Sequence, residues 1–350
     1  MADHRDPDVP RPLTRAAAIA LFLAFQLLVG LALSEGLLRT MYQHPAAWYP
    51  QALRNFFGFE YFYRRSIIQL DERFARYDPQ LLYTLRPGRF TFANVEYTTP
   101  YVVNSLGVRD EERELAQPDI VVVGDSYAMG WGVQQSENFP KVIERRTGRR
   151  VLNTAVASYG TVREMLLLDR VDLSKATTLI IQYCSNDFNE NEDFLKNGNR
   201  HVPSSRETWL SAGVQPRRVP RYWPLPMVYS AATWIKRGIE GRKRGGFEPS
   251  PEPPETAARL FLNALMHAPQ HDIGGLRIIV TDPDPDPAFI RALDRLHTAA
   301  EYPAWVRNII IVDVSARLTK DVFYLMDDHL RPAGHEAIAD ALIPALRSKF

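Results

Sequence analysis

The stretch Asp119-Ile120-Val121-Val122-Val123-Gly124-Asp125-Ser126 decides the fold of this chain. Its apolar, mostly β-branched run ends at a glycine, which is the pattern of a strand buried on both faces of a parallel sheet. Similar runs follow at residues 151–152, 179–183, 276–280 and 309–312. Helical patterning covers residues 138–147, 161–169, 256–268, 286–300 and 333–347. This alternation predicts a flavodoxin-like, three-layer α/β/α sandwich around a parallel sheet of about five strands.

The first predicted strand leads directly into a serine turn. Parallel sheets bind ligands at the carboxyl ends of their strands, and Gly124-Asp125-Ser126-Tyr127 follows such an end. A serine at a glycine-flanked turn from strand to helix exposes its hydroxyl there, beside backbone N–H groups that can stabilise an oxyanion. Glycine, aspartate and serine are also ordinary turn residues, so the run needs partners before it indicates catalysis.

Two further motifs supply such partners. The run Met326-Asp327-Asp328-His329 precedes the last helical stretch and offers a base beside acids that can orient it. Asn186, within QYCSNDFNEN at residues 182–191, presents a side-chain amide after the middle strand. Taken singly, the first could be a helix start with an exposed histidine, and the second an Asn-Asp turn. Their common place at one sheet edge favours a Ser-His-Asp site with Ser126 as nucleophile.

With these motifs in this order, residues 100–350 resemble the SGNH (GDSL-type) hydrolase family. The resemblance implies that Ser126 is the nucleophile, His329 the base and Asn186 a side-chain donor of the oxyanion hole. It also implies that the N–H of Ser126 lies in that hole.

The chain departs from the family pattern at three places. Ser158 stands at the glycine of the family's N-x-x-x-x-G block; it keeps the N–H donor, but its Cβ disfavours a positive φ. Gly160 is the alternative donor. The family's usual acid position holds Met326, so the resemblance to the membrane-anchored bacterial subgroup, which has Asp-x-His, favours Asp327 over Asp328. Cys184 replaces a frequent glycine, and a packing role is expected for it.

The N-terminal region contains a long apolar segment. Residues 16–34 include no charged residue and would form about 28 Å of helix, close to the hydrocarbon thickness of a bilayer. We therefore predict an uncleaved transmembrane anchor. A cleaved signal peptide is the alternative, because Ala32-Leu33-Ser34 resembles a cleavage site.

The charges around this segment predict its orientation. Arg5, Arg11 and Arg15 precede it, whereas only Arg39 follows it closely. The positive-inside rule then makes residues 1–15 a cytoplasmic tail. The catalytic domain would lie on the periplasmic side of a bacterial inner membrane.

The rest of the chain divides by composition. Residues 35–117, rich in aromatic residues and arginine, are predicted to form a stalk and an N-terminal extension, with small strands near residues 89–92 and 101–103. Residues 118–350 form the predicted SGNH hydrolase-like domain. A long insertion at about 193–255 interrupts it and ends in the proline-rich run PSPEPP at residues 249–254, which is typical of a flexible tether.

Composition excludes several classes of protein. The single cysteine among 350 residues rules out an internal disulfide and a Cys-rich zinc site, and no metal-ligand spacing occurs. A net charge of +1 argues against a nucleic-acid binder. No cofactor is expected. We predict a membrane-anchored serine esterase or O-acyltransferase, acting on an acylated carbohydrate or another small ester. O-acetyl groups of an envelope or exported polysaccharide are the expected substrate. A catalytically weak scaffold of an envelope-polymer assembly and a lipid esterase are the alternatives.

Overall fold

The computed structural model describes residues 14–214, 224–243 and 253–347. The chain forms two compact units. One comprises residues 1–57 with 220–247, and the larger comprises residues 58–219 with 248–350. Most of the predicted cytoplasmic tail, residues 1–13, and most of the predicted tether, residues 249–252, lie outside the described residues.

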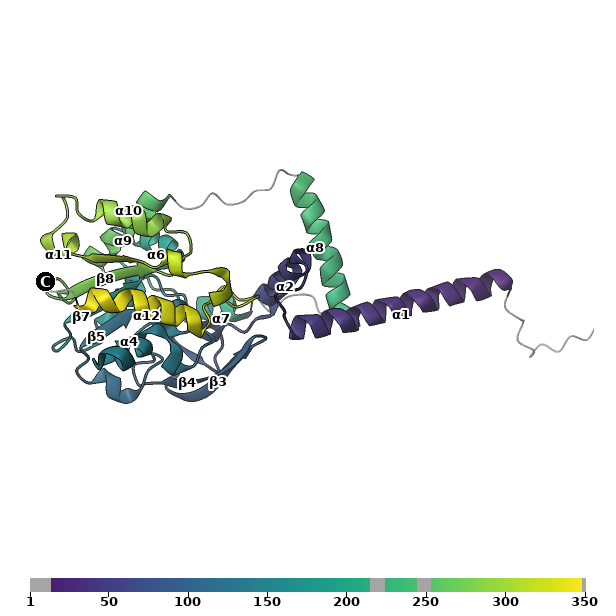
Figure 1. Cartoon of the computed structure of the whole chain (residues 1–350), viewed down its shortest axis with the longest axis horizontal. Coiled ribbons are helices and arrows are strands. Elements are labelled where there is room, and N and C mark those ends of the chain that lie inside the picture. The colour runs from purple at the N-terminus through teal and green to yellow at the C-terminus, as the bar shows by residue number, and fades with distance from the viewer. Residues whose placement is uncertain (1–13, 215–223, 244–252, 348–350) are drawn as a thin grey trace, which may run out of the picture. The chain divides into compact units, whose positions relative to one another are not determined.

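The larger unit is built on a parallel sheet of five strands (Figure 1). Each predicted strand is present, and neighbouring strands pair in parallel in the order β6-β5-β7-β8-β9. The predicted fold class is therefore confirmed. This order places the topological switch point between β5 and β7, where doubly wound sheets bind ligands. The strands are β5 Ile120–Val123, β6 Val151–Asn153, β7 Thr178–Gln182, β8 Arg277–Asp282 and β9 Ile310–Asp313.

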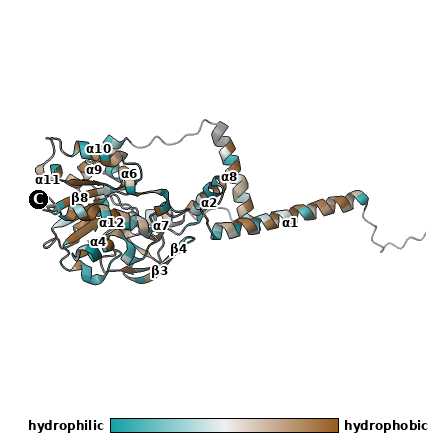
Figure 2. Ribbon diagram, in the orientation of Figure 1, coloured by the Kyte–Doolittle hydropathy of each residue, from teal (hydrophilic) through white to brown (hydrophobic). Residues whose placement is uncertain are grey.

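Helices cover both faces of this sheet because successive strand residues point to opposite sides. In β5, Val121 packs in the same hydrophobic cluster as α5, α9 and α10, whereas Val122 packs in the cluster that contains α4 and α12. The strands are therefore largely apolar, as Figure 2 shows for the sheet, with polar or charged residues mainly at their ends. The helices of this unit are α3 Ser126–Met129, α4 Phe139–Thr147, α5 Thr161–Leu168, α6 Asp187–Lys196, α7 Arg206–Val214, α9 Pro254–His267, α10 Ala288–Leu296, α11 Ala304–Arg307 and α12 Pro332–Arg347.

The N-terminal extension contributes two antiparallel hairpins to the larger unit. The predicted strands near residues 89–92 and 101–103 are confirmed as the pair β3 Gly88–Asn94 and β4 Tyr97–Val103, and β1 Ala75–Asp78 pairs with β2 Leu82–Leu85. Phe92 and Tyr101 are fully buried in the same cluster as residues of β5. The compact unit consequently begins at residue 58, and the extension predicted for residues 35–117 is divided between the two units.

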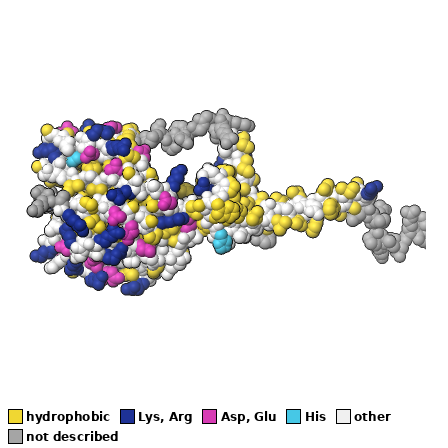
Figure 3. Space-filling model, in the orientation of Figure 1, with side chains coloured by type: hydrophobic (Ala, Val, Ile, Leu, Met, Phe, Trp, Pro, Cys, Tyr) yellow, Lys and Arg dark blue, Asp and Glu magenta, His cyan; other side chains and the backbone are white. Residues whose placement is uncertain are grey.

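Helix α2, Gln51–Arg64, contains the point at residue 57 where the two units divide. The smaller unit also contains α1, Arg15–Gln43, and α8, Pro226–Lys243. Helix α1 has a window of mean hydropathy 2.4, none of which is buried, and it is long enough to cross a membrane (Figure 3). Glu35 of α1 is buried and accepts the N–H groups of Met227 and Val228 at 2.9 and 3.0 Å, so it caps the start of α8.

Candidate active site

Ser126 is the first residue of α3, immediately after the turn that ends β5. Gly124, at φ +156°, makes this turn possible, since a Cβ there would lie 2.6 Å from Oε1 of Gln182. That oxygen accepts the N–H groups of Asp125 and Ala128 at 3.1 and 3.0 Å, which fixes the turn. The Ser126 side chain is therefore held at the carboxyl edge of the sheet, beside the switch point.

The structure brings the predicted serine, histidine and acid together. Nε2 of His329 lies 2.7 Å from Oγ of Ser126, and Nδ1 of His329 is hydrogen-bonded to Oδ1 of Asp327. Asp328 lies farther from the ring, with its Oδ1 3.3 Å from Nδ1, and its side chain is 73% exposed. Of the two candidate acids, Asp327 therefore has the geometry that fixes the imidazole, with Nδ1–H donating and Nε2 free to accept from the serine.

Asp327 and His329 each stabilise the charged form of the other. Burial alone would lower the pKa of His329, but the charge of Asp327 and its hydrogen bond offset burial and raise that pKa above its usual value. Burial alone would raise the pKa of Asp327, yet the charge of His329, its hydrogen bond and the Tyr61 hydroxyl hold this pKa below its usual range. Asp327 thus stays ionised throughout the pH range in which His329 titrates.

Three aromatic side chains donate hydrogen bonds to Oδ2 of Asp327, the carboxylate oxygen that does not contact the His329 ring. Oδ2 of Asp327 accepts hydrogen bonds from the Tyr61 hydroxyl, from the Tyr97 hydroxyl at 3.3 Å and from Nε1 of Trp131 at 3.2 Å. The Trp131 ring also stacks on His329, with centroids 5.0 Å apart. Tyr61 lies on α2 and Tyr97 on β4, so the extension supplies part of the site.

These aromatic partners are absent from the sequence-based prediction. Only Trp131 had a local signal, because it stands between two glycines next to the serine turn. Gly130 and Gly132 adopt φ values of +83° and +80°, which only glycine adopts without strain. A Cβ on Gly132 would lie 2.9 Å from the Tyr97 ring. The two glycines therefore mark residues 130–132 as a tightly packed turn that requires glycine at both positions.

The predicted oxyanion donors follow three neighbouring strands, β5, β6 and β7. Ser158 is exposed and adopts φ +59°, the left-handed conformation expected at a glycine position. Among the described residues, the N–H groups of Ser126 and Ser158 have no hydrogen-bond acceptor. The Asn186 amide donates one hydrogen to the carbonyl of Tyr159 at 3.2 Å, which leaves its second hydrogen for a ligand.

The alternative donor, Gly160, is already engaged. Its N–H donates to Oε2 of Glu190 at 3.3 Å, and the same carboxylate pairs with Arg163 at 2.6 Å. Arg163 in turn donates to the carbonyl of Ser158 at 2.5 Å. The geometry therefore favours Ser158 over Gly160 as the second backbone donor, and the ion pair braces the loop that carries it.

Two further features near the site could suggest other chemistry: the Cys184 thiol, and the cluster of Asp327, Asp328 and His329. Burial, with the charge of Asp125, raises the pKa of the Cys184 thiol well above its usual value, so the thiolate that reacts or binds metal is disfavoured. Asp327, Asp328 and His329 each place one ligand atom within 4.8 Å of the others. Asp327 and Ser126, however, engage both ring nitrogens of His329.

Comparison with known proteins gives matches in structure only. No family model matches the sequence, and no curated protein matches it. A lipolytic protein of the G-D-S-L family from Desulfitobacterium hafniense DCB-2 is 13% identical, with a TM-score of 0.35, over 64% of this chain and 97% of that chain. TesA is 14% identical, with a TM-score of 0.36, over 65% and 97% of the two chains. A family two carbohydrate esterase from Cellvibrio japonicus is 14% identical, with a TM-score of 0.35, over 66% and 61%. Such values leave the activity of this chain to be argued from its own site.

Proposed function

We propose that the chain is an SGNH-type serine esterase or O-acyltransferase that works through an acyl-Ser126 intermediate. The observation that carries this proposal is the continuous hydrogen-bonded series Ser126–His329–Asp327 at the switch point of the sheet. A serine hydroxyl is a weak nucleophile at neutral pH until an adjacent base accepts its proton. The same geometry argues against a catalytically weak scaffold.

The reaction would proceed in two steps. Oγ of Ser126 attacks the ester carbonyl while Nε2 of His329 takes the hydroxyl proton, and Asp327 stabilises the imidazolium. The oxyanion is held by the N–H groups of Ser126 and Ser158 and by the Asn186 amide. His329 then protonates the leaving alcohol, and the C–O bond to that alcohol breaks. Water, or a hydroxyl of an acceptor, repeats the sequence in reverse and releases the acyl group from the serine.

We further propose O-acetyl groups of an envelope or exported polysaccharide as the substrate, with α1 as an inner-membrane anchor and the site on the periplasmic side. The apolar, unburied surface of α1 and the basic residues before it support the anchor. The anchor also keeps a bilayer-lipid esterase as the second candidate.

A series of p-nitrophenyl esters of increasing acyl length tests this function. The full-length protein should prefer acetate to octanoate, and adding an oligosaccharide acceptor should reveal transfer if the enzyme is an acyltransferase. A preference for long acyl chains would favour the lipid esterase instead.

A further inference from the structure

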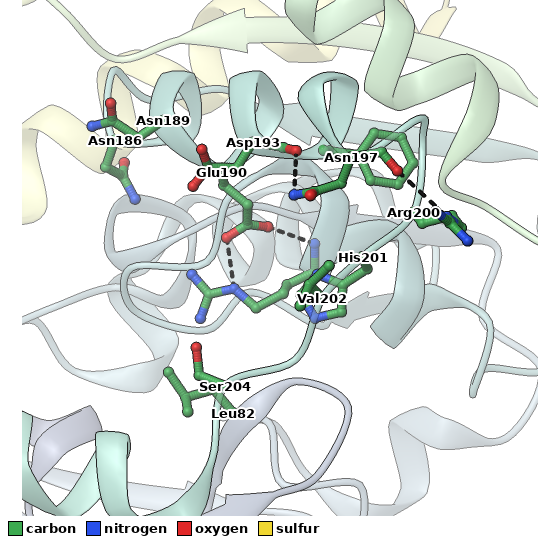
Figure 4. A pocket seen from close by; sticks show the side chains of 12 residues that line it. Leu82, Asn186, Asn189, Glu190, Asp193, Asn197, Arg200, His201, Val202 and Ser204 are labelled. Atoms are coloured by element: carbon green, nitrogen blue, oxygen red, sulfur yellow. Dashed lines mark hydrogen bonds and ion pairs between the residues drawn. The ribbon is translucent and has the colours of Figure 1, made fainter.

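A pocket with many polar side chains in its lining begins at Asn186 and continues along helix α6 (Figure 4). Its volume is about 590 Å³, within the range of roughly 300–1,000 Å³ that is usual for small-molecule sites. The pocket lies between α6 and the segment that follows this helix, and all of it belongs to the larger unit. Asn186 is also the proposed oxyanion donor, so the pocket adjoins the proposed active site at this residue.

One face of α6 supplies a row of polar side chains. Asn186, Asn189, Asp193 and Asn197 are spaced three or four residues apart, so they lie on the same side of the helix, as Figure 4 shows. Asp193 accepts a hydrogen bond from the Asn197 side chain through its backbone carbonyl, at 2.8 Å. Its carboxylate and the Asn189 side chain have no hydrogen-bond or ion-pair partner in the described part of the chain. Both amide and carboxylate groups are thus open to a ligand.

The charges that line the pocket balance. Arg163 is neutralised by Glu190, and the remaining carboxylate of Asp193 is matched by Arg200, whose only hydrogen bond among described residues is a long one, 3.4 Å to a backbone carbonyl. Nε2 of His201 is hydrogen-bonded to the carbonyl of Gln80 at 2.7 Å, and no hydrogen bond of its Nδ1 occurs within the described residues. A lining with many donors and acceptors but no net charge suits hydroxyl groups, each of which donates and accepts.

The same lining offers few apolar side chains to a long acyl chain. The apolar side chains in it are those of Leu82, Phe194 and Val202, and Phe194 is only 4% exposed. An acyl chain in this space would desolvate amides and carboxylates without replacing their hydrogen bonds.

We propose that this pocket binds a neutral carbohydrate unit, the alcohol part of the ester that is cleaved at Ser126 or the acceptor to which its acyl group is transferred. This proposal rests on the proposed function and adds the part of the enzyme that recognises the sugar. Arg163 and Glu190 also hold the loop that carries Ser158, the proposed oxyanion donor. Substituting either of them could therefore change the catalytic step as well as the pocket.

Adjacent acids on α6 provide a matched pair for the test. Asp193 lines the pocket, whereas Glu192 does not and pairs instead with Lys196. In the full-length protein, D193A should raise KM for O-acetylated xylo-oligosaccharides about tenfold, since a hydrogen bond to a charged group is lost. E192A should leave that KM unchanged. Both variants should keep kcat/KM for p-nitrophenyl acetate within about twofold of wild type, because this ester lacks a sugar.

A blocking variant and a binding measurement complete the design. N189W should fill the pocket and lower activity on the oligosaccharide acetates but not on p-nitrophenyl acetate. Saturation-transfer NMR with unacetylated xylo-oligosaccharides should show binding to wild type and E192A and its loss in D193A. This readout needs no catalysis, so it separates failure of the pocket from failure of the proposed function.

The contrary outcomes are distinct. If N189W instead abolishes activity on p-nitrophenyl octanoate and spares the sugar esters, the pocket holds an acyl chain and the proposal is overturned. If D193A and E192A behave alike on oligosaccharides, or the NMR experiment shows no binding to wild type, the carbohydrate site does not exist.

Discussion

Asp327 is a buried carboxylate that is surrounded by hydrogen-bond donors. Nδ1 of His329 and the backbone N–H of His329 donate to Oδ1, while two tyrosines and a tryptophan donate to Oδ2. Burying an ionised carboxylate is costly unless such donors replace water. The arrangement therefore keeps the charge that His329 needs, in one orientation.

The two aspartates next to His329 should differ sharply on substitution. D327N removes the charge that stabilises the imidazolium, so kcat should fall by about 10³-fold, whereas D328N should cost only a few-fold, because its side chain is largely exposed. Steady-state kinetics on p-nitrophenyl acetate measure both. The reverse ranking would show that Asp328 is the acid.

The pH profile should reflect the raised pKa of His329. The base must be neutral to accept the proton from Ser126, so kcat/KM should rise with pH through a pKa above the usual 6.5. In D327N the raising charge is gone while burial remains, so the residual activity should rise at a lower pH. An acid limb that stays in place in D327N would contradict the assignment.

Tyr61 is a positioning residue that acts through Asp327. In Y61F one donor to Oδ2 is lost, so the carboxylate attracts the His329 proton more strongly and the acid limb of kcat/KM should move to higher pH. Turnover should fall about tenfold, in line with the loss of one hydrogen bond to a charged group. Y63F changes a half-exposed tyrosine of the same helix and should alter neither quantity. A loss of thermal stability in Y61F without a shifted profile would assign Tyr61 a structural role only.

At the level of elements, local sequence patterns predicted the strands and helices but not the contacts between distant parts of the chain. The strands are short apolar runs that end at turns. The candidate catalytic residues lie within a few positions of predicted strands or helices, so the edge of the sheet could be assembled from the sequence. The contact of Tyr61 with Asp327 joins residues 266 positions apart, and no local pattern marks it. The same holds for Glu35, whose partners Met227 and Val228 lie in the predicted insertion.

Helices α5 and α6 enclose a carboxyl group that lacks a partner. Both carboxyl oxygens of Glu164 are buried without a hydrogen bond among the described residues. Burial and the nearby charge of Asp187 raise the pKa of Glu164 well above its usual value. A raised carboxyl pKa favours the folded state below the unfolded pKa of about 4.3, and this contribution is lost as pH rises toward the folded pKa.

Replacing this glutamate should therefore change the pH dependence of stability. Relative to wild type, E164Q should have a similar melting temperature near pH 4 and one roughly 2–6 °C higher near pH 8, because glutamine cannot ionise. Calorimetric melting curves at both pH values measure the difference. E192Q, at a half-buried position on α6 whose carboxylate pairs with Lys196, is the control and should show a much smaller trend. An equal gain at both pH values would mean that ionisation of Glu164 is not involved.

For the whole molecule, the central question is whether α1 stays attached. An uncleaved anchor predicts that the protein remains in the membrane fraction after carbonate extraction and that its intact mass includes residues 16–34. Cleavage after Ser34 would release a soluble protein of lower mass. It would also leave Glu35 at a new N-terminus, where it could no longer cap α8 from within a helix. Recovery of such a species would establish the signal-peptide alternative.

Labelling by a fluorophosphonate probe tests the account most directly, because the probe reacts only with a serine that a neighbouring base has activated. The full-length protein should be labelled, and mass spectrometry should place the adduct on Ser126. Labelling should disappear in S126A, fall strongly in H329A and persist in D328N. A folded wild-type protein that resists the probe, or an adduct on a different residue, would contradict the assignment and favour a scaffold without catalysis.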